Sequence, residues 1–216
     1  MSSPRSYRLG FLARAVGRLG YLGFIEPFLR TAKRKICRVI SALEASSVLE
    51  VGCGACTQAR ALARLGLRVT ALDVSDRMFP LRRSLLPENL TVLQADGRSL
   101  PFPDHAFDVA LASMALHEMP PEDRRPVLGE MLRVVRPGGT IVIMDFHFEE
   151  QQSTTLAEIL IRLIEWGAGR EHHAHFLDFV AHGGIPPLAR AAGCTVVRRQ
   201  SILAERGGIF ELTVLP

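Results

Sequence analysis

Short apolar runs alternate with longer amphipathic segments along most of the chain. The apolar runs have the length of buried β-strands, and the segments 57–65 and 122–135 have the pattern of helices. This alternation is typical of an α/β fold with a doubly wound, mostly parallel sheet. Seven strands are predicted, at 48–51, 68–72, 91–94, 107–112, 140–144, 194–200 and 209–215, and the last two are joined by a turn at Gly207 and Gly208.

A further helix is predicted after the fifth strand, because apolar residues recur there at intervals of three and four. It belongs to a segment of about 147–185 that separates the fifth and sixth strands. We expect this segment to be an insertion that covers a substrate. The apolar stripe of its helix consists of Leu156, Ile159, Leu160, Leu163 and Ile164.

The turn after the first predicted strand has the composition of a nucleotide-binding loop. The stretch 48–59 reads V-L-E-V-G-C-G-A-C-T-Q-A. Gly52 and Gly54 permit a tight turn and leave room for a ligand close to the backbone. The helix that follows presents unpaired N–H groups, which suit a negatively charged ligand group. Thr57 stands where a dinucleotide-binding loop has a third small residue, so that fingerprint is incomplete.

Four acidic residues stand at or near the ends of predicted strands, where open α/β sheets bind their ligands. Asp73 follows Glu50 by 23 residues, close to the spacing at which a carboxylate meets the ribose hydroxyls of a nucleotide. An acid in this position can also serve only to cap the next helix. The glycine turn favours the ribose role. The four acids are Glu50, Asp73, Asp96 and Asp145.

Several segments together resemble the class I S-adenosylmethionine-dependent methyltransferases. Glu50, Gly52 and Gly54 match that family's first motif, E/D-x-G-x-G-x-G, and Cys56 stands at its final glycine, although a cysteine tolerates a positive φ poorly. The segments 94–102, 104–108 and 132–139 resemble its later motifs, so the likeness covers 48–145. It is nearest to the ubiquinone- and menaquinone-biosynthesis methyltransferases, and implies a Rossmann-like fold that ends in an antiparallel hairpin.

The resemblance also implies the cofactor, S-adenosylmethionine, and the residues that bind it. Asp96 is expected to accept a hydrogen bond from the adenine amino group, and Asp73 to bind the ribose. The predicted cofactor-binding residues are Glu50, Gly52, Cys53, Gly54, Asp73, Val74, Met78, Asp96, Gly97 and Ser113.

His117 is the candidate catalytic residue. Methyl transfer needs chiefly the alignment of donor and acceptor, and a base is needed only if the acceptor must lose a proton. His117 follows the fourth strand and, as a neutral imidazole, can take such a proton. A packing or hydrogen-bonding role beside the adenosine pocket is the alternative. Glu118 is expected to point away from the site.

The histidine-rich segment 171–175, followed by His182, permits three interpretations. Clustered histidines can bind a metal ion, contact an anionic or phenolic substrate, or lie on a solvated helix. We expect no metal and assign substrate contact to His172, His173 and His175.

The N-terminal segment 1–40 carries nine basic side chains and one acid, a charge of +8 in a chain whose net charge is +4. This arm fits an organellar transit peptide, an amphipathic helix on anionic lipid, or a lid over the cofactor. We favour a lid within 1–45 that also contacts a membrane surface, with Tyr21 near the substrate, above a methyltransferase domain at 46–216. A nucleic-acid partner is not indicated by the basic arm alone.

Composition limits the remaining possibilities. No uninterrupted apolar run reaches the roughly 18 residues that a membrane-spanning helix needs. The four cysteines are scattered, which favours a reducing, cytoplasmic compartment. Cys53 and Cys56 form a C-x-x-C, and a second ligand pair for zinc is not evident nearby, so we interpret them as small residues of the loop.

The sequence therefore predicts methyl transfer to a small or lipid-like acceptor, with quinones and phospholipids favoured. A nicotinamide-dependent oxidoreductase shares the sheet but is disfavoured by Glu50, Thr57 and the region of Asp96. A non-catalytic relative that keeps the fold is the remaining alternative.

Overall fold

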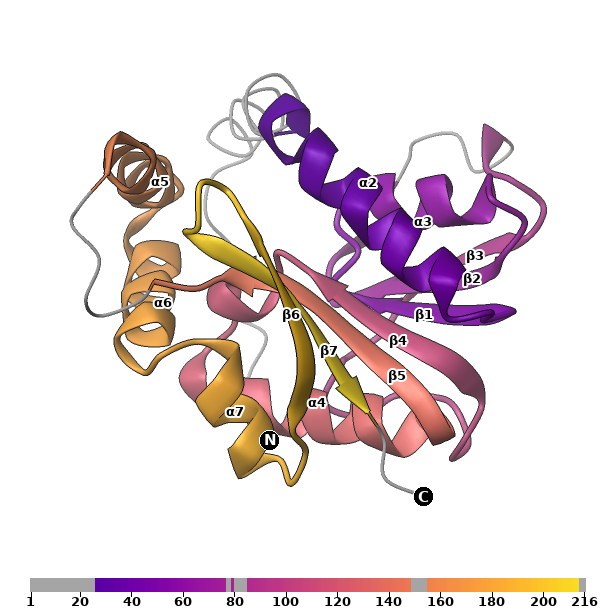
Figure 1. Ribbon diagram of the computed structural model, residues 1–216. Helices are drawn as coiled ribbons and strands as arrows, with labels where there is room; N and C mark the ends of the chain where they lie inside the picture. The colour runs from indigo at the N-terminus through magenta and orange to yellow at the C-terminus, as the bar shows by residue number, and fades with distance from the viewer. Residues whose placement is uncertain (1–25, 77–78, 80–84, 149–154, 214–216) are drawn as a thin grey trace.

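The computed structural model describes residues 26–76, 79, 85–148 and 155–213. It contains a seven-stranded sheet in the order β3-β2-β1-β4-β5-β7-β6 (Figure 1). The pairs among β1 to β5 are parallel, whereas β7 is antiparallel to β5 and to β6. The strands are β1 (Ser47–Val51), β2 (Arg68–Asp73), β3 (Leu90–Gln94), β4 (Phe107–Ser113), β5 (Val135–Phe146), β6 (Val196–Ile202) and β7 (Gly207–Thr213).

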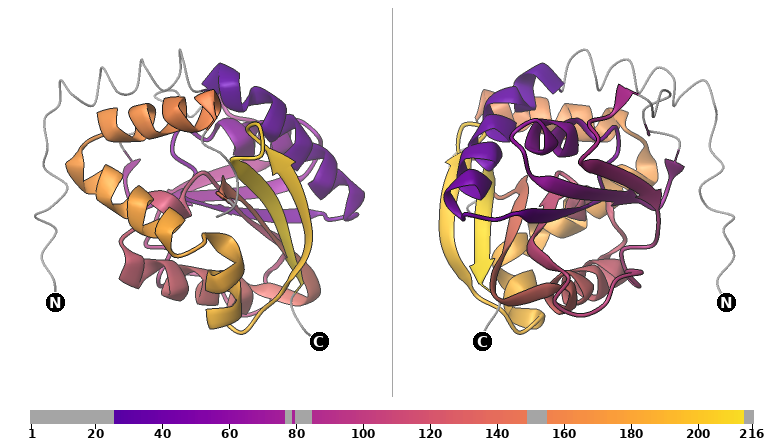
Figure 2. Two further views of the ribbon diagram at one scale, coloured as in Figure 1. Left: turned by 60° about the vertical axis from the view of Figure 1, so that its left-hand side comes forward. Right: turned by 90° about the vertical axis from the view of Figure 1, so that its right-hand side faces the viewer.

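Helices cover both faces of this sheet, as the two side views show (Figure 2). On one face, α2 (Glu26–Ala42) and α3 (Thr57–Ala63) pack against β1, β2 and β4. On the other face, α4 (Pro121–Val134) and α7 (Ile185–Ala191) bury their apolar sides. The result is a three-layer α/β fold, and the predicted seven-stranded sheet with its antiparallel hairpin is confirmed.

Helix α2 belongs to this body, although it lies in the basic arm of the sequence. Ile36 and Ile40 are fully buried against the sheet, whereas Arg30, Arg34 and Arg38 point to solvent. The spacing of four residues within each set gives the helix one apolar and one basic side. The predicted lid at 1–45 thus includes a packed helix, and its segment 1–25 lies outside the described part of the chain.

The insertion between β5 and β6 forms two helices, α5 (Leu156–Gly167) and α6 (Arg170–Ala181). The predicted helix at α5 is therefore present. Its apolar stripe is largely exposed to solvent, and Leu156 and Leu163 of the stripe are 86% and 58% exposed. The buried side of α5 instead contributes Ile161 and Glu165. None of the described helices combines the length and apolar character needed to cross a bilayer.

The turn of the final hairpin differs from its prediction. Gly207 and Gly208 lie inside β7, where they pair with Phe146 and Asp145 at the end of β5. The turn falls earlier, at 203–205, where three consecutive non-glycine residues have a positive φ. A Cβ at Gly207 would lie 3.2 Å from the Asp145 carbonyl oxygen, so the glycine allows β7 to approach β5 closely. A requirement of packing, rather than of a turn, explains the pair of glycines.

Candidate active site

The loop between β1 and α3 has the compact conformation that its glycines predicted. Gly52 and Gly54 have φ values of +72° and +49°. The backbone N–H groups of Gly52 and Cys53 both donate to the carbonyl oxygen of Leu72, each at 2.9 Å, which holds the loop against β2. A Cβ on Gly54 would meet no heavy atom within 4 Å. The loop is thus closely held to the sheet and open on its other side, as a cofactor-binding loop must be.

Cys56 occupies the left-handed conformation that the family's glycine would adopt, with φ 55° and ψ 29°. The loop keeps its shape at this position although a residue with a Cβ pays about 1–2 kcal/mol for this conformation. The side chain is fully buried, and its Sγ lies 3.3 Å from that of Cys53. This thiol contact, together with burial, raises the pKa of Cys53. Cys53 and Cys56 are 7% and 0% exposed, so the two thiols pack against each other inside the loop.

Asp73, at the end of β2, connects two segments of the loop region. Its carboxylate accepts hydrogen bonds from the N–H of Gly54 at 2.9 Å and from the N–H of Ser75 at 3.0 Å. The carboxylate therefore lies directly against the glycine loop. A carboxylate has about four acceptor positions, and hydrogen bonds from the described residues use two of them, which leaves room for the hydroxyls of a ribose. The position fits the ribose role that the spacing predicted.

Glu50 is a buried carboxyl group behind the same loop. Its side chain is 2% exposed, and burial raises its pKa from 4.5 to about 8. Its Oε2 is without a hydrogen-bond partner among the described residues, as is the buried Oγ of Ser113 at the end of β4. A buried polar atom in this state is costly, and a ligand that pairs with it recovers that free energy. The ammonium group of S-adenosylmethionine is such a partner, so the site fits this cofactor.

The other predicted cofactor-binding residues have different surroundings. The Asp96 carboxylate forms an ion pair with Arg98 at 2.6 Å, which lowers the pKa of Asp96. A Cβ on Gly97 would lie 3.1 Å from Val51 and 3.3 Å from Val127, so this glycine lets α4 pack closely. Val74 is half exposed beside Asp73. Met78 and Tyr21 lie outside the described residues, and their roles stay predictions.

A buried carboxylate holds the segment that carries His117. Asp145, fully buried at the end of β5, accepts the Nδ1 hydrogen of His117 at 2.7 Å. It also accepts the backbone N–H groups of Leu116, His117 and Phe146 at 2.8–3.3 Å. His117 lies in η4 (Leu116–Glu118), a 3₁₀ turn after β4. Met114, just before it, has a φ of 55°, a strained backbone conformation of a kind that clusters at functional sites.

The surroundings of His117 bear on its protonation. Burial acts to lower its pKa, but the charges and hydrogen bond of Asp145, with Glu165 and Glu118 nearby, raise it to about 9. A raised pKa favours the protonated ring in the free protein. Its role as a base stays a prediction that requires a change around its Nε2.

The histidines of α6 separate in space. His172 alone of the predicted set reaches the ring of His117, with ring centroids 5.7 Å apart, and it hydrogen-bonds the Glu165 carboxylate at 2.5 Å. His175 bonds the backbone oxygen of Glu118 at 2.9 Å, and His173 stacks on Phe176. Helix geometry explains this separation, because neighbouring residues point about 100° apart.

The sequence singled out neither Glu165 nor Arg124, and it made Glu118 a weaker candidate than His117. Glu165 of α5 lies with its Oε2 3.8 Å from the Nε2 of His117. Glu118 was expected to point away, yet its Oε1 lies 3.9 Å from the same atom, because a 3₁₀ turn winds more tightly than an α-helix. Buried Arg124 joins η4 to α6, donating to the oxygens of Leu116 and Met119 and pairing with Asp178.

Comparison with known proteins agrees with this geometry. The family model of the methyltransferase domain matches residues 49–143. Two solved structures share the fold: a Burkholderia thailandensis 1,6-didemethyltoxoflavin-N1-methyltransferase (19% identity, TM-score 0.62, all of this chain and 92% of that one) and human N-acetylserotonin methyltransferase in complex with S-adenosylmethionine (16%, 0.65, 92% and 56%). Over residues 49–143 the chain is therefore similar to a methyltransferase domain, and it shares the fold of S-adenosylmethionine-dependent methyltransferases.

Within that class the chain resembles the ubiquinone and menaquinone group. It is 33% identical over 144 residues to a demethylmenaquinone methyltransferase of Tropheryma whipplei, covering 65% of this chain and 59% of the relative. It is 35% identical over 114 residues to a 2-methyl-6-phytyl-1,4-hydroquinone methyltransferase of Synechocystis, covering 51% and 35%. The chain thus spans less than two thirds of the length of these curated relatives.

Replacement of Asp73 by alanine should weaken cofactor binding strongly. The variant loses the ribose acceptor and also the acceptor of the Gly54 N–H, so we expect the Kd for S-adenosylhomocysteine to rise by roughly 10–100-fold. Isothermal titration calorimetry measures this change, and circular dichroism checks that the protein is folded. Asp76→Ala, an exposed acid three residues on, is the control. Equal affinities of the two variants would contradict the assignment.

Replacement of Glu50 by glutamine should affect stability and binding in opposite directions. The folded-state pKa of about 8 lies above the ordinary 4.5, so the wild-type chain loses stability as the pH rises through this interval. Glu50→Gln removes that loss, and its melting temperature should exceed the wild-type value at pH 8 and approach it near pH 5. Cofactor affinity should fall by roughly tenfold or more, because an amide, unlike the Glu50 carboxyl group, cannot ionise to pair with the ammonium group of the cofactor.

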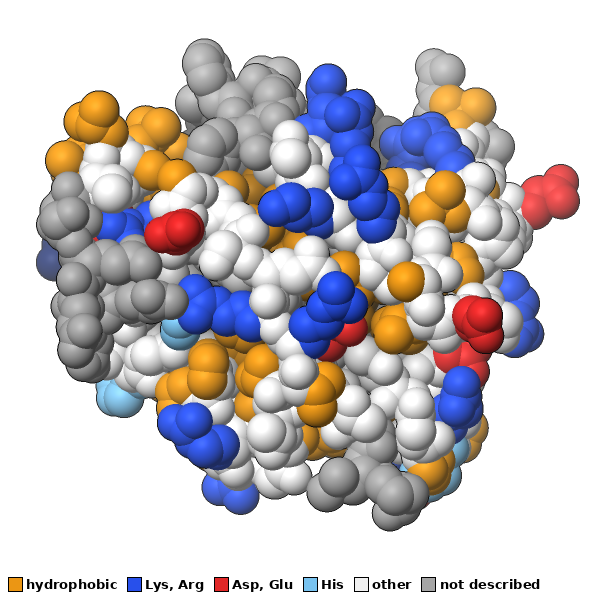
Figure 3. Space-filling view, in the orientation of Figure 1, with side chains coloured by type: hydrophobic (Ala, Val, Ile, Leu, Met, Phe, Trp, Pro, Cys, Tyr) orange, Lys and Arg blue, Asp and Glu red, His pale blue; other side chains and the backbone are white. Residues whose placement is uncertain are grey.

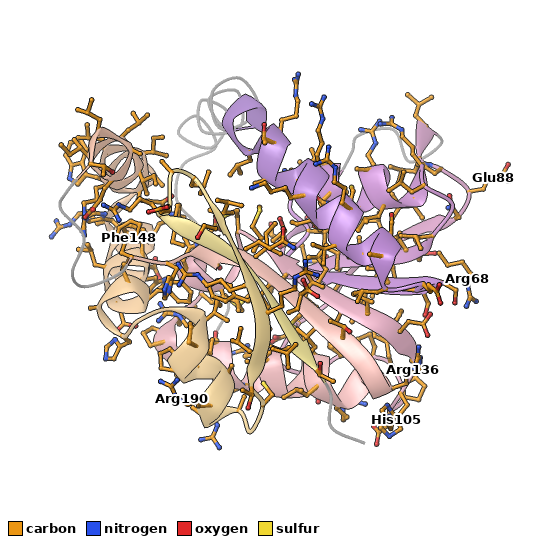
Figure 4. The ribbon with its side chains drawn as sticks, viewed as in Figure 1. Arg68, Glu88, His105, Arg136, Phe148 and Arg190 are labelled. Carbon is orange, nitrogen blue, oxygen red and sulfur yellow. The ribbon has the colours of Figure 1, made fainter. Side chains whose placement is uncertain are left out.

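The control is Glu88→Gln, an exposed acid at the far end of the molecule (Figure 4). A melting temperature that is lowered by Glu50→Gln at pH 8, with cofactor affinity unaltered, would contradict the role given to Glu50.

Proposed function

We propose that the protein transfers a methyl group from S-adenosylmethionine to a reduced, quinone-type ring. One observation carries this proposal: the cofactor loop lies near a polar cluster at the ends of β4 and β5. Behind the loop, the buried Oε2 of Glu50 has no hydrogen-bond partner among the described residues. The names of the curated relatives support a hydroquinone or demethylmenaquinone acceptor. The chain matches only part of the length of those relatives, so the acceptor is proposed here and does not follow from their names.

In this proposal, one group of residues binds the cofactor and another binds the acceptor. When bound, S-adenosylmethionine supplies an activated methyl group. Glu50 and Asp73 would hold its ammonium and ribose groups, and the loop at Gly54 leaves the space it needs. Alignment of donor and acceptor then supplies much of the acceleration.

Aromatic side chains adjoin the polar cluster on its protein side. Phe146 lies with its ring centroid 4.7 Å from that of His117 and 5.2 Å from that of Phe176. Phe148, which is partly buried, extends this group beside α5 and α6 (Figure 4). Phe146 and Phe176 are buried, so of these rings only Phe148 could meet a planar aromatic ligand, and the nearby imidazoles and carboxylates favour its hydroxyl groups. The combination supports a hydroquinone rather than an aliphatic acceptor.

A methyl-transfer assay tests the proposal. The full chain is incubated with methyl-labelled S-adenosylmethionine and a prenylated naphthohydroquinone that carries hydrogen at one ring position. Label should enter the ring, and Asp73→Ala should lower the rate at limiting cofactor by at least tenfold, as its weaker cofactor binding requires. Label that enters added phospholipid and not the hydroquinone would overturn the acceptor. Binding of NADH without binding of S-adenosylmethionine would overturn the reaction.

We also propose that the protein works at the cytoplasmic surface of a membrane, where a prenylated acceptor is found. The exposed apolar side of α5 supports this, with Leu160, Leu163 and Trp166 each at least half exposed. Basic side chains gather over the neighbouring α2 (Figure 3), and the two helices line one hollow. An apolar helix face beside a basic one suits a bilayer that carries anionic lipids. The basic arm at 1–25 would add to this attraction.

Fluorescence can test the membrane contact directly, because Trp166 is the only tryptophan of the chain. Vesicles with anionic phosphatidylglycerol should shift its emission to shorter wavelength and sediment the protein, and neutral phosphatidylcholine vesicles should do so less. The double variant Leu160→Glu, Leu163→Glu should lose both effects. Val197→Glu, at an exposed apolar residue of β6, is the matched control. Unchanged sedimentation of the double variant would refute contact through α5.

A further inference from the structure

We infer that His117, Glu118, Glu165 and His172 bind one divalent transition-metal ion of the zinc type. Two imidazole nitrogens and two carboxylate groups come from three separate elements, η4, α5 and α6. One ligand atom from each of His117, Glu118 and His172 lies within 4.8 Å of the others. Histidine with carboxylate is a ligand set that zinc and its neighbours in the first transition row accept, whereas magnesium and calcium prefer oxygen alone.

The distances are close to those of a tetrahedral site. Ligands at the usual 2.0–2.1 Å from zinc lie about 3.3 Å from one another. The Nε2 of His117 is 3.8 Å from the Oε2 of Glu165 and 3.9 Å from the Oε1 of Glu118. The direct hydrogen bond between Glu165 and His172, at 2.5 Å, would lengthen by under an ångström to admit the ion. The ligand atoms of His117, Glu118 and His172 lie within 4.8 Å of one another, so they would draw together by up to about 1.5 Å around the ion.

The second shell has the arrangement that metal-binding histidines require. The Nδ1 of His117 is held by the Asp145 carboxylate at 2.7 Å, which leaves its Nε2 to face the other ligands. A carboxylate on the far nitrogen of the ring orients a metal-binding histidine and makes it a better ligand. Three backbone N–H groups fix the Asp145 carboxylate in turn. The histidine is thus oriented before an ion arrives.

Charge and access also favour an ion. Asp145, Glu118 and Glu165 place three carboxyl groups around two imidazoles, and the described part of the chain brings no lysine or arginine into ion-pairing contact with those three. A dication would offset that concentration of negative charge. His117 and Glu165 are 2% and 8% exposed, but Glu118 is 51% exposed. The cluster is therefore buried on its protein side and open on one side, as a site with an exchangeable ligand needs to be.

The ion would act on the acceptor of the proposed function, and this part of the inference rests on that function. An acceptor hydroxyl that displaces the half-exposed Glu118 carboxylate from the ion would become more acidic and lose its proton to solvent water, because the ion stabilises the oxygen anion. The resulting oxyanion donates electron density to its ring. Binding of the ion would displace the Nε2 proton of His117 to solvent, so in this role the ring is a ligand and not the base.

Metal binding is tested without acceptor or cofactor. Protein dialysed against a chelator is titrated with Zn²⁺ by calorimetry and with Co²⁺ by visible absorption, whose intensity reports tetrahedral coordination. We expect one ion per chain and visible Co²⁺ bands that Zn²⁺ abolishes and Mg²⁺ does not. His172→Ala and Glu165→Gln should each weaken binding by roughly 10–100-fold. His182→Ala, an exposed histidine at the end of the same helix, should bind as the wild type does.

Two results would overturn the site: the absence of stoichiometric binding, or binding that both His172→Ala and Glu165→Gln leave unaltered. Glu165→Gln keeps a hydrogen-bonding partner for His172, so a loss of binding in this variant with an unchanged circular dichroism spectrum is not a loss of fold. The methyl-transfer assay separates the two proposals. Stoichiometric binding without transfer to a hydroquinone would refute the acceptor alone, whereas transfer undiminished by a chelator would refute the role of the ion.

Discussion

The arrangement of the site depends on one buried carboxylate. Asp145 is fully enclosed, and a buried carboxylate is tolerated only where hydrogen bonds satisfy it. Four donors do so: one imidazole and three backbone N–H groups. These bonds hold the turn after β4 against the end of β5 and determine the orientation of His117. Glu118, Glu165 and His172 form a cluster only because they lie around that ring.

The cofactor loop is built on a compromise between stability and binding. Glu50 has an oxygen with no partner among the described residues, and Cys56 holds a backbone conformation that costs free energy. Both features are understandable if the bound cofactor is part of the final structure. The ammonium group then satisfies the carboxylate, and the loop keeps its shape for the ligand. Natural proteins often carry such strain at the sites where they bind.

Local patterns predicted the fold well and the exposure of single helices poorly. The seven strands were found because each buried strand is a short apolar run, and the motifs from Glu50 to Asp145 follow them in order. The apolar stripe of α5 looked like any core helix, yet most of it faces solvent. The glycines at 207 and 208 looked like a turn, yet they serve the close approach of β7 to β5. The spacing of apolar residues indicates that a helix has an apolar side, but it does not indicate what covers that side.

The sequence by itself determined the class of fold, the cofactor loop and the acids at the strand ends. These features are local, because a strand, its turn and the next helix follow one another directly along the chain. Only the tertiary structure decided which residues meet at the acceptor side. Glu165 and His172 are far from His117 along the chain, and they reach it through the packing of α5 and α6 over η4. A single sequence has no signal for such a meeting, because the packing of distant elements, and not their spacing, brings those side chains together.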